Sequence, residues 1–184
     1  MTAAPLAIVA PLGAFLLIVL TRRAAAPLAL AGAVIGLLAA VISLVQVASG
    51  TREELVFRGL PVFPFRLVVD PLAAVLSLTV AVVAFGVFLY AVGYMGEDPD
   101  RVRFYAELSF FVGAMQTLVL AGDWILFLAA WELIGLASYL LIGFWFERPG
   151  VPASATGRRR RPDATPSISF TDAFSALSRG RNPG

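Results

Sequence analysis

Five long apolar runs divide the first 149 residues of the chain. Each is close to the roughly 20 residues that an α-helix needs to cross a lipid bilayer. The runs cover about residues 3–20, 24–48, 71–95, 104–121 and 124–146. Charged and polar residues gather between the runs, where such helices would meet water. The pattern predicts an all-α integral membrane protein, with about five transmembrane helices in a membrane domain over residues 1–149.

Helix-starting signals mark the later runs. Asp70 and Asp123 each stand directly before a run, where a carboxylate can accept the free backbone N–H groups of the first helical turn. The fourth run has a second candidate start one turn earlier, at Pro99 with Asp98 as its cap. Only Gly122 and Asp123 separate the fourth and fifth runs, so we expect these two helices to form a tight antiparallel pair.

Residues 50–69 form the one substantial loop between the predicted helices. Short apolar pieces in it are separated by Gly59 and Pro61, which favour turns. The pieces are residues 56–57, 62–63 and 67–69. We expect a small β-hairpin at the membrane surface.

Composition supports a membrane protein and excludes several kinds of site. Hydrophobic residues make up 59% of the 184 residues and charged residues only 14%, whereas about a quarter of the residues in a soluble domain are charged. The chain has no cysteine and no histidine, which excludes disulfides, thiolate metal sites and the usual proton shuttle. No phosphate loop, metal cluster or nucleophile–base pair is visible. We therefore expect no catalytic, cofactor-binding or metal site and no nucleic-acid partner.

Arginines predict how the helices are oriented. All 14 basic residues are arginine, and basic residues favour the cytoplasmic side of a membrane. With the N-terminus outside, the inner side receives residues 22–23, 101, 103 and the arginines of the C-terminal tail, while the outer loop receives residues 52, 58 and 66. The tail, residues 150–184, is rich in Pro, Ser, Arg and Gly. Such a segment cannot bury enough apolar surface to fold, and we expect it to be disordered and cytoplasmic.

Glu132 is the sharpest chemical feature of the sequence. It lies about 12 Å from the start of the fifth run at the helical rise of 1.5 Å per residue. A charged group at such a depth costs on the order of 3 kcal/mol, so it normally faces a partner, a cavity or a proton path. The alternative is a protonated glutamate that is hydrogen-bonded in a helix interface and has no transport role.

Helical spacing places three other residues on the face of Glu132. They are Gly135, Leu136 and Tyr139. Gly135 would admit a closely packed neighbouring helix. The hydroxyl of Tyr139 would extend a proton chain, although such a tyrosine more often serves packing alone.

The remaining acidic residues near helix ends have structural explanations. We expect Asp70 and Asp123 to cap helices rather than to bind ions. Glu107 lies four residues after Arg103, which is the spacing of an intrahelical salt bridge.

Three stretches resemble the antiporter-like membrane subunits of respiratory complex I. The match is nearest to subunit L of bacterial NADH-quinone oxidoreductase, which is called subunit 5 in mitochondria. The first stretch is Phe-Arg-Leu-Val-Val-Asp-Pro-Leu at 65–72. The second is Tyr-Ala-Val-Gly-Tyr-Met at 90–95, followed by Arg-Phe-Tyr at 103–105. The third is Leu-Val-Leu-Ala at 118–121, followed by Trp-Glu-Leu-Ile-Gly-Leu-Ala-Ser-Tyr-Leu-Leu-Ile-Gly-Phe-Trp at 131–145.

The resemblance implies that residues 1–149 are the N-terminal part of a proton-translocating subunit whose transport is coupled to quinone reduction. Glu132 corresponds to the glutamate that, in this family, pairs with a lysine on a later helix. NADH, flavin, iron–sulfur clusters and quinone would be bound by other subunits, with no direct NADH binding here. The implied partners are membrane lipid and other membrane subunits of complex I, and the implied location is the bacterial inner membrane. The chain departs from the family in having no lysine.

Three alternatives stay open at this point. The family also includes subunits of multisubunit cation/proton antiporters, of energy-converting hydrogenases and of inorganic-carbon uptake systems. Beside the complex I subunit and these related subunits, the remaining alternative is a non-functional truncated remnant. Because the family pattern stops after about residue 149, we expect the tail from near Gly157 to be non-native sequence that follows a truncation or frameshift.

Overall fold

A computed structural model describes residues 3–22, 24–50, 53–57, 65–96 and 98–145. The chain divides into two compact units, residues 1–144 and 145–184. The tail predicted for residues 150–184 lies outside the described residues, as do residues 62–63 of the predicted hairpin.

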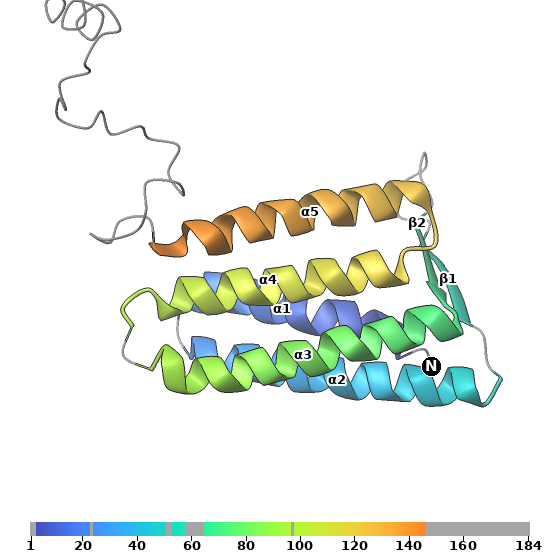
Figure 1. The fold of residues 1–184 in the computed structure, drawn as a ribbon, viewed down its shortest axis with the longest axis horizontal. Helices are drawn as coiled ribbons and strands as arrows, with labels where there is room; N and C mark the ends of the chain where they lie inside the picture. The colour runs from blue at the N-terminus through green and yellow to red at the C-terminus, as the bar shows by residue number, and fades with distance from the viewer. Residues whose placement is uncertain (1–2, 23, 51–52, 58–64, 97, 146–184) are drawn as a thin grey trace, which may run out of the picture. The chain divides into compact units, whose positions relative to one another are not determined.

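Five α-helices, one short 3₁₀ helix and one β-hairpin make up the described fold (Figure 1). The elements are α1 (Ala4–Thr21), α2 (Ala25–Ala48), β1 (Glu53–Phe57), β2 (Phe65–Val69), α3 (Pro71–Tyr94), α4 (Arg101–Leu120), α5 (Trp124–Ile142) and the short 3₁₀ helix η1 (Gly143–Trp145). Successive helices run in opposite directions. The prediction of an all-α membrane bundle is confirmed.

The two ends of the bundle differ in what they carry. The N-terminus, the β-hairpin and the α4–α5 turn lie at one end, which we call the hairpin end (Figure 1). The links between α1 and α2 and between α3 and α4 lie at the other. We call this the arginine end, because Arg22, Arg101 and Arg103 are there.

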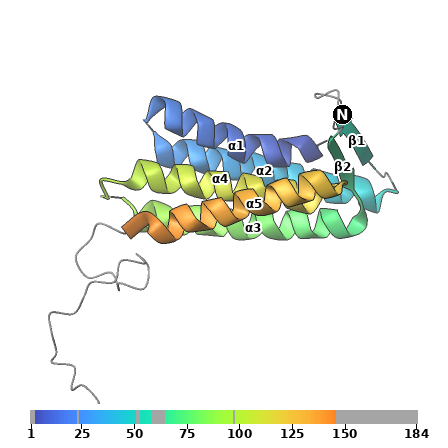
Figure 2. The same ribbon diagram turned by 90° about the horizontal axis from the view of Figure 1, so that it is seen from above.

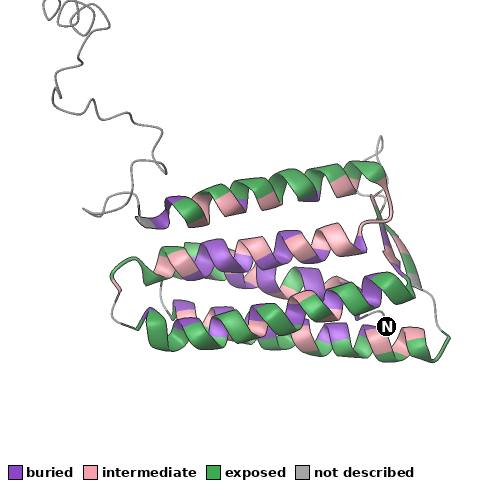
Figure 3. Cartoon of the chain, in the orientation of Figure 1, coloured by how far each residue is buried: buried purple, intermediate pink, exposed green. Residues whose placement is uncertain are grey.

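Alanine is the commonest buried residue of the bundle, and many large apolar residues are exposed; Figure 3 shows the exposed positions along the outside of the helices. The buried stripe of α2 consists of alanine, glycine and one serine, at residues 25, 29, 32, 33, 36, 39, 40 and 43. Leucine, isoleucine and valine of the same helix face outward. This arrangement is the reverse of a soluble protein and is typical of helices that associate in lipid, where small residues let the backbones approach closely.

Helix α4 is the least apolar helix and lies against all the others. Within the described residues, α1, α2, α3 and α5 are long and apolar enough to cross a membrane, but α4 is not counted among them. It packs on α1, α2, α3 and α5 (Figure 2). Its polar side chains are therefore enclosed by protein rather than by lipid: the amide of Gln116 accepts a hydrogen bond from the Ser77 hydroxyl at 2.7 Å and donates one to the Ser77 carbonyl at 3.0 Å.

The start of α4 differs from both predicted positions. The helix begins at Arg101, with Asp100 as a cap residue that makes no side-chain capping bond. The Asp98 carboxylate accepts a hydrogen bond from the Asp100 backbone N–H at 2.9 Å. Asp98 thus stabilises the turn before the helix instead of capping a helix that starts at Pro99.

The predicted β-hairpin is confirmed and packs on the α4–α5 turn. Strands β1 and β2 pair antiparallel, with Leu55 opposite Leu67. The backbone N–H of Gly122 donates to the carbonyl of Arg66 at 2.8 Å. A Cβ at Gly122 would lie 3.1 Å from that same oxygen and 2.5 Å from a methyl of Val68, so this close approach requires glycine.

Candidate functional site

Glu132 lies on the outward face of α5. The helix packs on α4 through a face that contains its two buried residues, Ala130 and Ala137. At about 100° per residue, Glu132 lies roughly 200° around the helix from Ala130. The glutamate is accordingly exposed, and the outward surface of α5 in Figure 3 is exposed along most of its length.

The surroundings of Glu132 are apolar. Leu128, Trp131 and Leu136 are all exposed large hydrophobic residues on the same helix. Among the described residues, no hydrogen bond or ion pair reaches the Glu132 carboxylate. A carboxyl group in an apolar, outward-facing surface is unusual, because membrane-embedded acids almost always face a protein interior or a water-filled cavity.

Gly135 and Tyr139 share this face, as the helical spacing predicts. The Cβ position of Gly135 has no atom within 4 Å, so no neighbouring helix of the described chain makes the close approach that we expected. Tyr139 is exposed and lies seven residues after Glu132, about 10 Å along the helix axis. Water or another side chain would have to join the two groups in any proton transfer.

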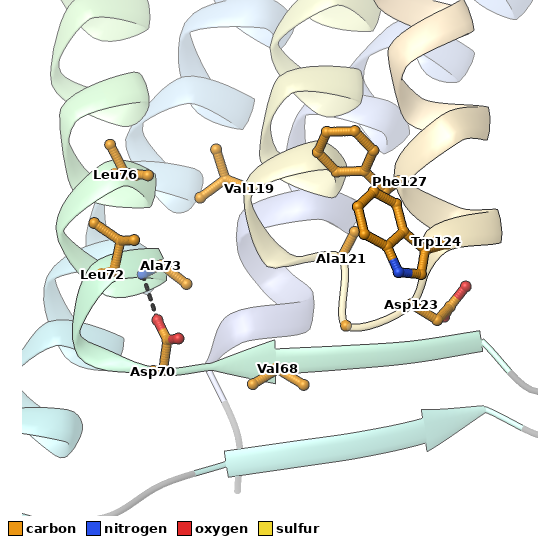
Figure 4. Close-up of a pocket in the computed structure, with 11 residues that line it drawn as sticks. Val68, Asp70, Leu72, Ala73, Leu76, Val119, Ala121, Asp123, Trp124 and Phe127 are labelled. Carbon is orange, nitrogen blue, oxygen red and sulfur yellow. Dashed lines mark hydrogen bonds between the residues drawn. The ribbon is translucent and has the colours of Figure 1, made fainter.

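The two capping predictions are confirmed. Asp70 accepts a hydrogen bond from the backbone N–H of Ala73 at 2.7 Å, and Asp123 accepts one from Leu126 at 2.8 Å. Both aspartates border a pocket of about 470 Å³ between α3, β2 and the α4–α5 turn, which is otherwise lined mainly by apolar side chains (Figure 4). Within the described residues no group of three acidic side chains gathers in a form that suits a metal ion.

Asp123 also joins the β-hairpin to α5. Its second oxygen accepts the backbone N–H of Arg66 at 2.7 Å. Burial alone would raise the pKa of Asp123, but backbone hydrogen bonds from Leu126, Arg66 and Ile125, together with the charge of Arg66, lower that pKa below its ordinary value overall. The sequence predicted the cap but not the Arg66 contact, which joins residues 57 positions apart.

The salt bridge between Arg103 and Glu107 is confirmed. The Nε atom of Arg103 donates to Oε1 of Glu107 at 2.6 Å. Glu107 is buried, and its other oxygen, Oε2, has no hydrogen-bond partner within the described part of the chain. The buried pair of Ser77 and Gln116 was not predicted, because no local sequence pattern relates residues 39 positions apart.

Comparison with known proteins places part of this arrangement in a family. Residues 60–105 match the family described as NADH-ubiquinone oxidoreductase (complex I), chain 5 N-terminus. This segment covers β2, α3 and the first turn of α4. Glu132 lies after it.

Individual relatives extend the similarity. The F(420)H(2) dehydrogenase subunit L of Methanosarcina mazei is 47% identical over 87 residues, which are 47% of this chain and 13% of that protein. The NADH-quinone oxidoreductase subunit L of Mycobacterium tuberculosis is 44% identical over 91 residues, or 50% of this chain and 14% of that protein. The chloroplastic NAD(P)H-quinone oxidoreductase subunit 5 of Mesostigma viride is 51% identical over 81 residues, or 44% and 12%.

The chain therefore matches only a short part of the length of these relatives, between 12% and 14%. The resemblance to subunit L and subunit 5 that the sequence motifs indicated is confirmed. Residues 60–105 match the N-terminal domain of complex I chain 5, and the chain is similar, over about half of its own length, to proteins named subunit L and subunit 5.

Proposed function

We propose that this chain forms the N-terminal helices of a proton-translocating membrane subunit of an NADH-quinone oxidoreductase. In this proposal Glu132 is one half of a proton-relay pair. The observation that carries it is the position of Glu132, a carboxyl group on the outward, apolar face of α5 with no partner among the described residues. Further helices packed on that face would remove the carboxyl group from lipid and supply its partner.

The chemistry of such a pair follows from electrostatics. An isolated charge in the bilayer costs on the order of 3 kcal/mol on insertion scales. A cation within about 4–6 Å favours the ionised carboxylate, and the carboxylate in turn favours the protonated cation. If the two groups separate, the cationic partner releases its proton more readily. This coupling lets a conformational change drive proton uptake and release.

A lysine partner of Glu132 has to come from outside this sequence. The family resemblance implies a lysine on a later helix, and this chain contains no lysine. We infer that the partner belongs to the remainder of a longer subunit or to a neighbouring chain. Tyr139 is assigned a secondary part, as a hydroxyl on the same face that contacts water in the path.

The names of the relatives differ in their electron donors. They include an F(420)H(2) dehydrogenase, an NADH-quinone oxidoreductase and chloroplastic NAD(P)H-quinone oxidoreductases. We infer that the membrane helices are common to these complexes and that other subunits bind the donor, the flavin, the iron–sulfur clusters and the quinone. The partners of this chain would then be membrane lipid and the other membrane subunits.

The proposed orientation places the hairpin end outside and the arginine end in the cytoplasm of a bacterial inner membrane. The positive-inside rule supports it, because Arg22, Arg101 and Arg103 lie at one end. The chain has no cysteine, so single cysteines report their side cleanly. In spheroplasts, a membrane-impermeant maleimide should label Ser49→Cys and leave Gly96→Cys unlabelled. The reverse pattern would show that the orientation is wrong.

The function is tested by complementation. Residues 1–149 replace the matching N-terminal helices of subunit L in a bacterial host, and NADH-driven acidification is measured in inverted membrane vesicles. We expect the chimera to pump, Glu132→Gln to abolish pumping, and Glu54→Gln, an exposed residue of the hairpin, to leave it intact. Equal pumping by wild type and Glu132→Gln would refute the role of Glu132. Sodium-driven proton flux without NADH would favour a cation/proton antiporter instead.

A further inference from the structure

A second carboxyl group of the bundle, Glu107 on α4, borders a cavity of about 610 Å³ at the arginine end. The cavity lies between α1, α4 and α5. Phe15 and Val19 of α1 and Leu140 of α5 form apolar walls. The charged groups that line it are Arg22 at the end of α1, and Asp100, Arg103 and Glu107 at the start of α4. From α5 only Leu140 contributes.

Glu107 is built into this cavity rather than displayed on the surface. The residue is only 7% exposed. One carboxylate oxygen, Oε1, is held by Arg103, and the other, Oε2, is buried without a partner among the described residues. Buried polar atoms of proteins nearly always have a hydrogen-bond partner. The cavity is lined mainly by apolar side chains and by four charged residues, and its volume is large enough for water. Oε2 itself is buried and has no partner among the described residues, so it is the oxygen that is left to bind a proton.

Arg103 is held in place on both sides. Its guanidinium donates to Glu107, and its central carbon lies 6.0 Å from the centre of the Phe144 ring, within the range of a cation–π contact. Only Nε reaches the carboxylate, so the pair is not the two-point contact that would occupy both oxygens. Oε1 can therefore keep its hydrogen bond while Oε2 changes its protonation state.

We propose that Glu107 is a proton-binding site that exchanges protons with water in this cavity from the arginine end of the bundle. Uptake forms an O–H bond at Oε2 and converts the carboxylate into a neutral carboxyl group, while Arg103 stays charged. The site is separate from Glu132, which lies on another helix and faces outward. Because it needs only this chain, it goes beyond the proposed function and does not depend on a partner subunit.

The proton site is tested by infrared difference spectroscopy of the full chain in lipid nanodiscs. Spectra are compared between acidic and neutral buffer, in H₂O and in D₂O, with Glu132→Gln as the background so that one membrane carboxyl group remains. We expect a protonated-carboxyl band that is sensitive to deuterium, is lost in Glu107→Gln and is retained in Glu54→Gln, which removes an exposed carboxylate. A spectrum that Glu107→Gln leaves unchanged would overturn the proposal.

A second variant separates proton binding from a purely structural salt bridge. Arg103→Gln keeps Glu107 and removes the neighbouring cation, which favours the charged carboxylate. The variant also removes the hydrogen bond to Oε1, so we expect the carboxyl band of Glu107 to change its frequency in Arg103→Gln. A band that is the same in both proteins, or one that sodium ions remove at constant pH, would contradict a proton site beside Arg103.

Cysteine labelling measures whether water reaches the cavity. Val102 lines the cavity, whereas Val83 of α3 is exposed on the outside of the bundle, where lipid would cover it. A charged, water-soluble thiol reagent should label Val102→Cys and spare Val83→Cys in nanodiscs. Labelling of neither residue would show that water does not reach Glu107 and would contradict exchange through this cavity. These measurements use the chain alone, so their failure is distinguishable from failure of the complementation test.

Discussion

Single side chains at the hairpin end fasten the hairpin to the helices. Asp123 accepts backbone hydrogen bonds from Leu126 on α5 and from Arg66 on β2. At the start of α3, Asp70 accepts one hydrogen bond, from the backbone N–H of Ala73. Each carboxylate thus satisfies N–H groups that the first turn of a helix leaves without partners. The consequence is that both acids have structural roles at the starts of helices.

The lowered pKa of Asp123 makes a pH-dependent prediction. A carboxylate whose folded pKa is lowered stabilises the fold at pH values above its unfolded pKa of about 4. That stabilisation is lost as the pH falls through the folded pKa. We expect Asp123→Ala to reduce the free energy of unfolding in detergent micelles by about 1–2 kcal/mol at neutral pH, and the difference from wild type to shrink in acid.

Asp100 provides the matched control for this prediction. It is the cap residue of α4 but makes no side-chain capping bond. Asp100→Ala should therefore change the unfolding free energy much less than Asp123→Ala. A difference between wild type and Asp123→Ala that stays constant into strong acid would show that its carboxylate does not contribute through its charge.

At the scale of the helices, most boundaries were predictable and most pairings were not. A cap such as Asp70 bonds a backbone N–H three residues away, and a long apolar run by itself indicates a helix in lipid. Both features can therefore be recognised from neighbouring residues in the sequence. The pair of Ser77 and Gln116 joins residues 39 positions apart, and the place of α4 among the other helices depends on how all of them pack. The same limit applied to Glu132: spacing predicted its face, but not that this face would lack a partner among the described residues.

The close packing of α1 on α2 predicts different effects on stability for alanine at two glycines, Gly32 and Gly86. A Cβ at Gly32 would lie 2.8 Å from the Cβ of Ala14 and 3.1 Å from the carbonyl oxygen of Ala10. Neither atom belongs to a flexible side-chain end, so Gly32→Ala must push the helices apart. We expect a loss of about 1–3 kcal/mol in the free energy of unfolding, measured by titration with SDS in mixed micelles.

Gly86 of α3 is the control because nothing lies within 4 Å of its Cβ position. Alanine is favoured over glycine inside a helix by up to about 1 kcal/mol. Gly86→Ala should therefore be neutral or stabilising in the same titration. Equal losses at both positions would contradict the close approach of α1 and α2.

At the scale of the whole molecule, the bundle is complete around α4 and open along α5. Helices α1 and α3 each pack on α2, and all three pack on α4, whereas α5 packs on α4 with small contributions from β2. The open face carries Trp131, which is 60% exposed. Trp131 lies about 10 Å from the start of α5, so it is well inside a hydrocarbon layer of about 30 Å. In the isolated chain this face must meet lipid.

Quenching of tryptophan fluorescence by lipids brominated in mid-chain tests this directly. The three tryptophans of the chain are Trp124, Trp131 and Trp145, so Trp124→Phe with Trp145→Phe leaves Trp131 as the only reporter. We expect strong quenching, because the indole faces the acyl chains. The control replaces Trp131 with Phe as well and introduces Tyr105→Trp, at a position that is buried inside the bundle and should be quenched much less.

Assembly should reverse the result for Trp131. If helices from the remainder of a subunit cover the outward face of α5 and supply the partner of Glu132, the bromine atoms can no longer reach the indole. Quenching of Trp131 should then fall to the level of the Tyr105→Trp control when the chain is incorporated into the complementing complex. If quenching of Trp131 stays as strong in a complex that pumps protons, the face of Glu132 remains in contact with lipid. The proton-relay partner of Glu132 then does not lie on a helix packed on that face.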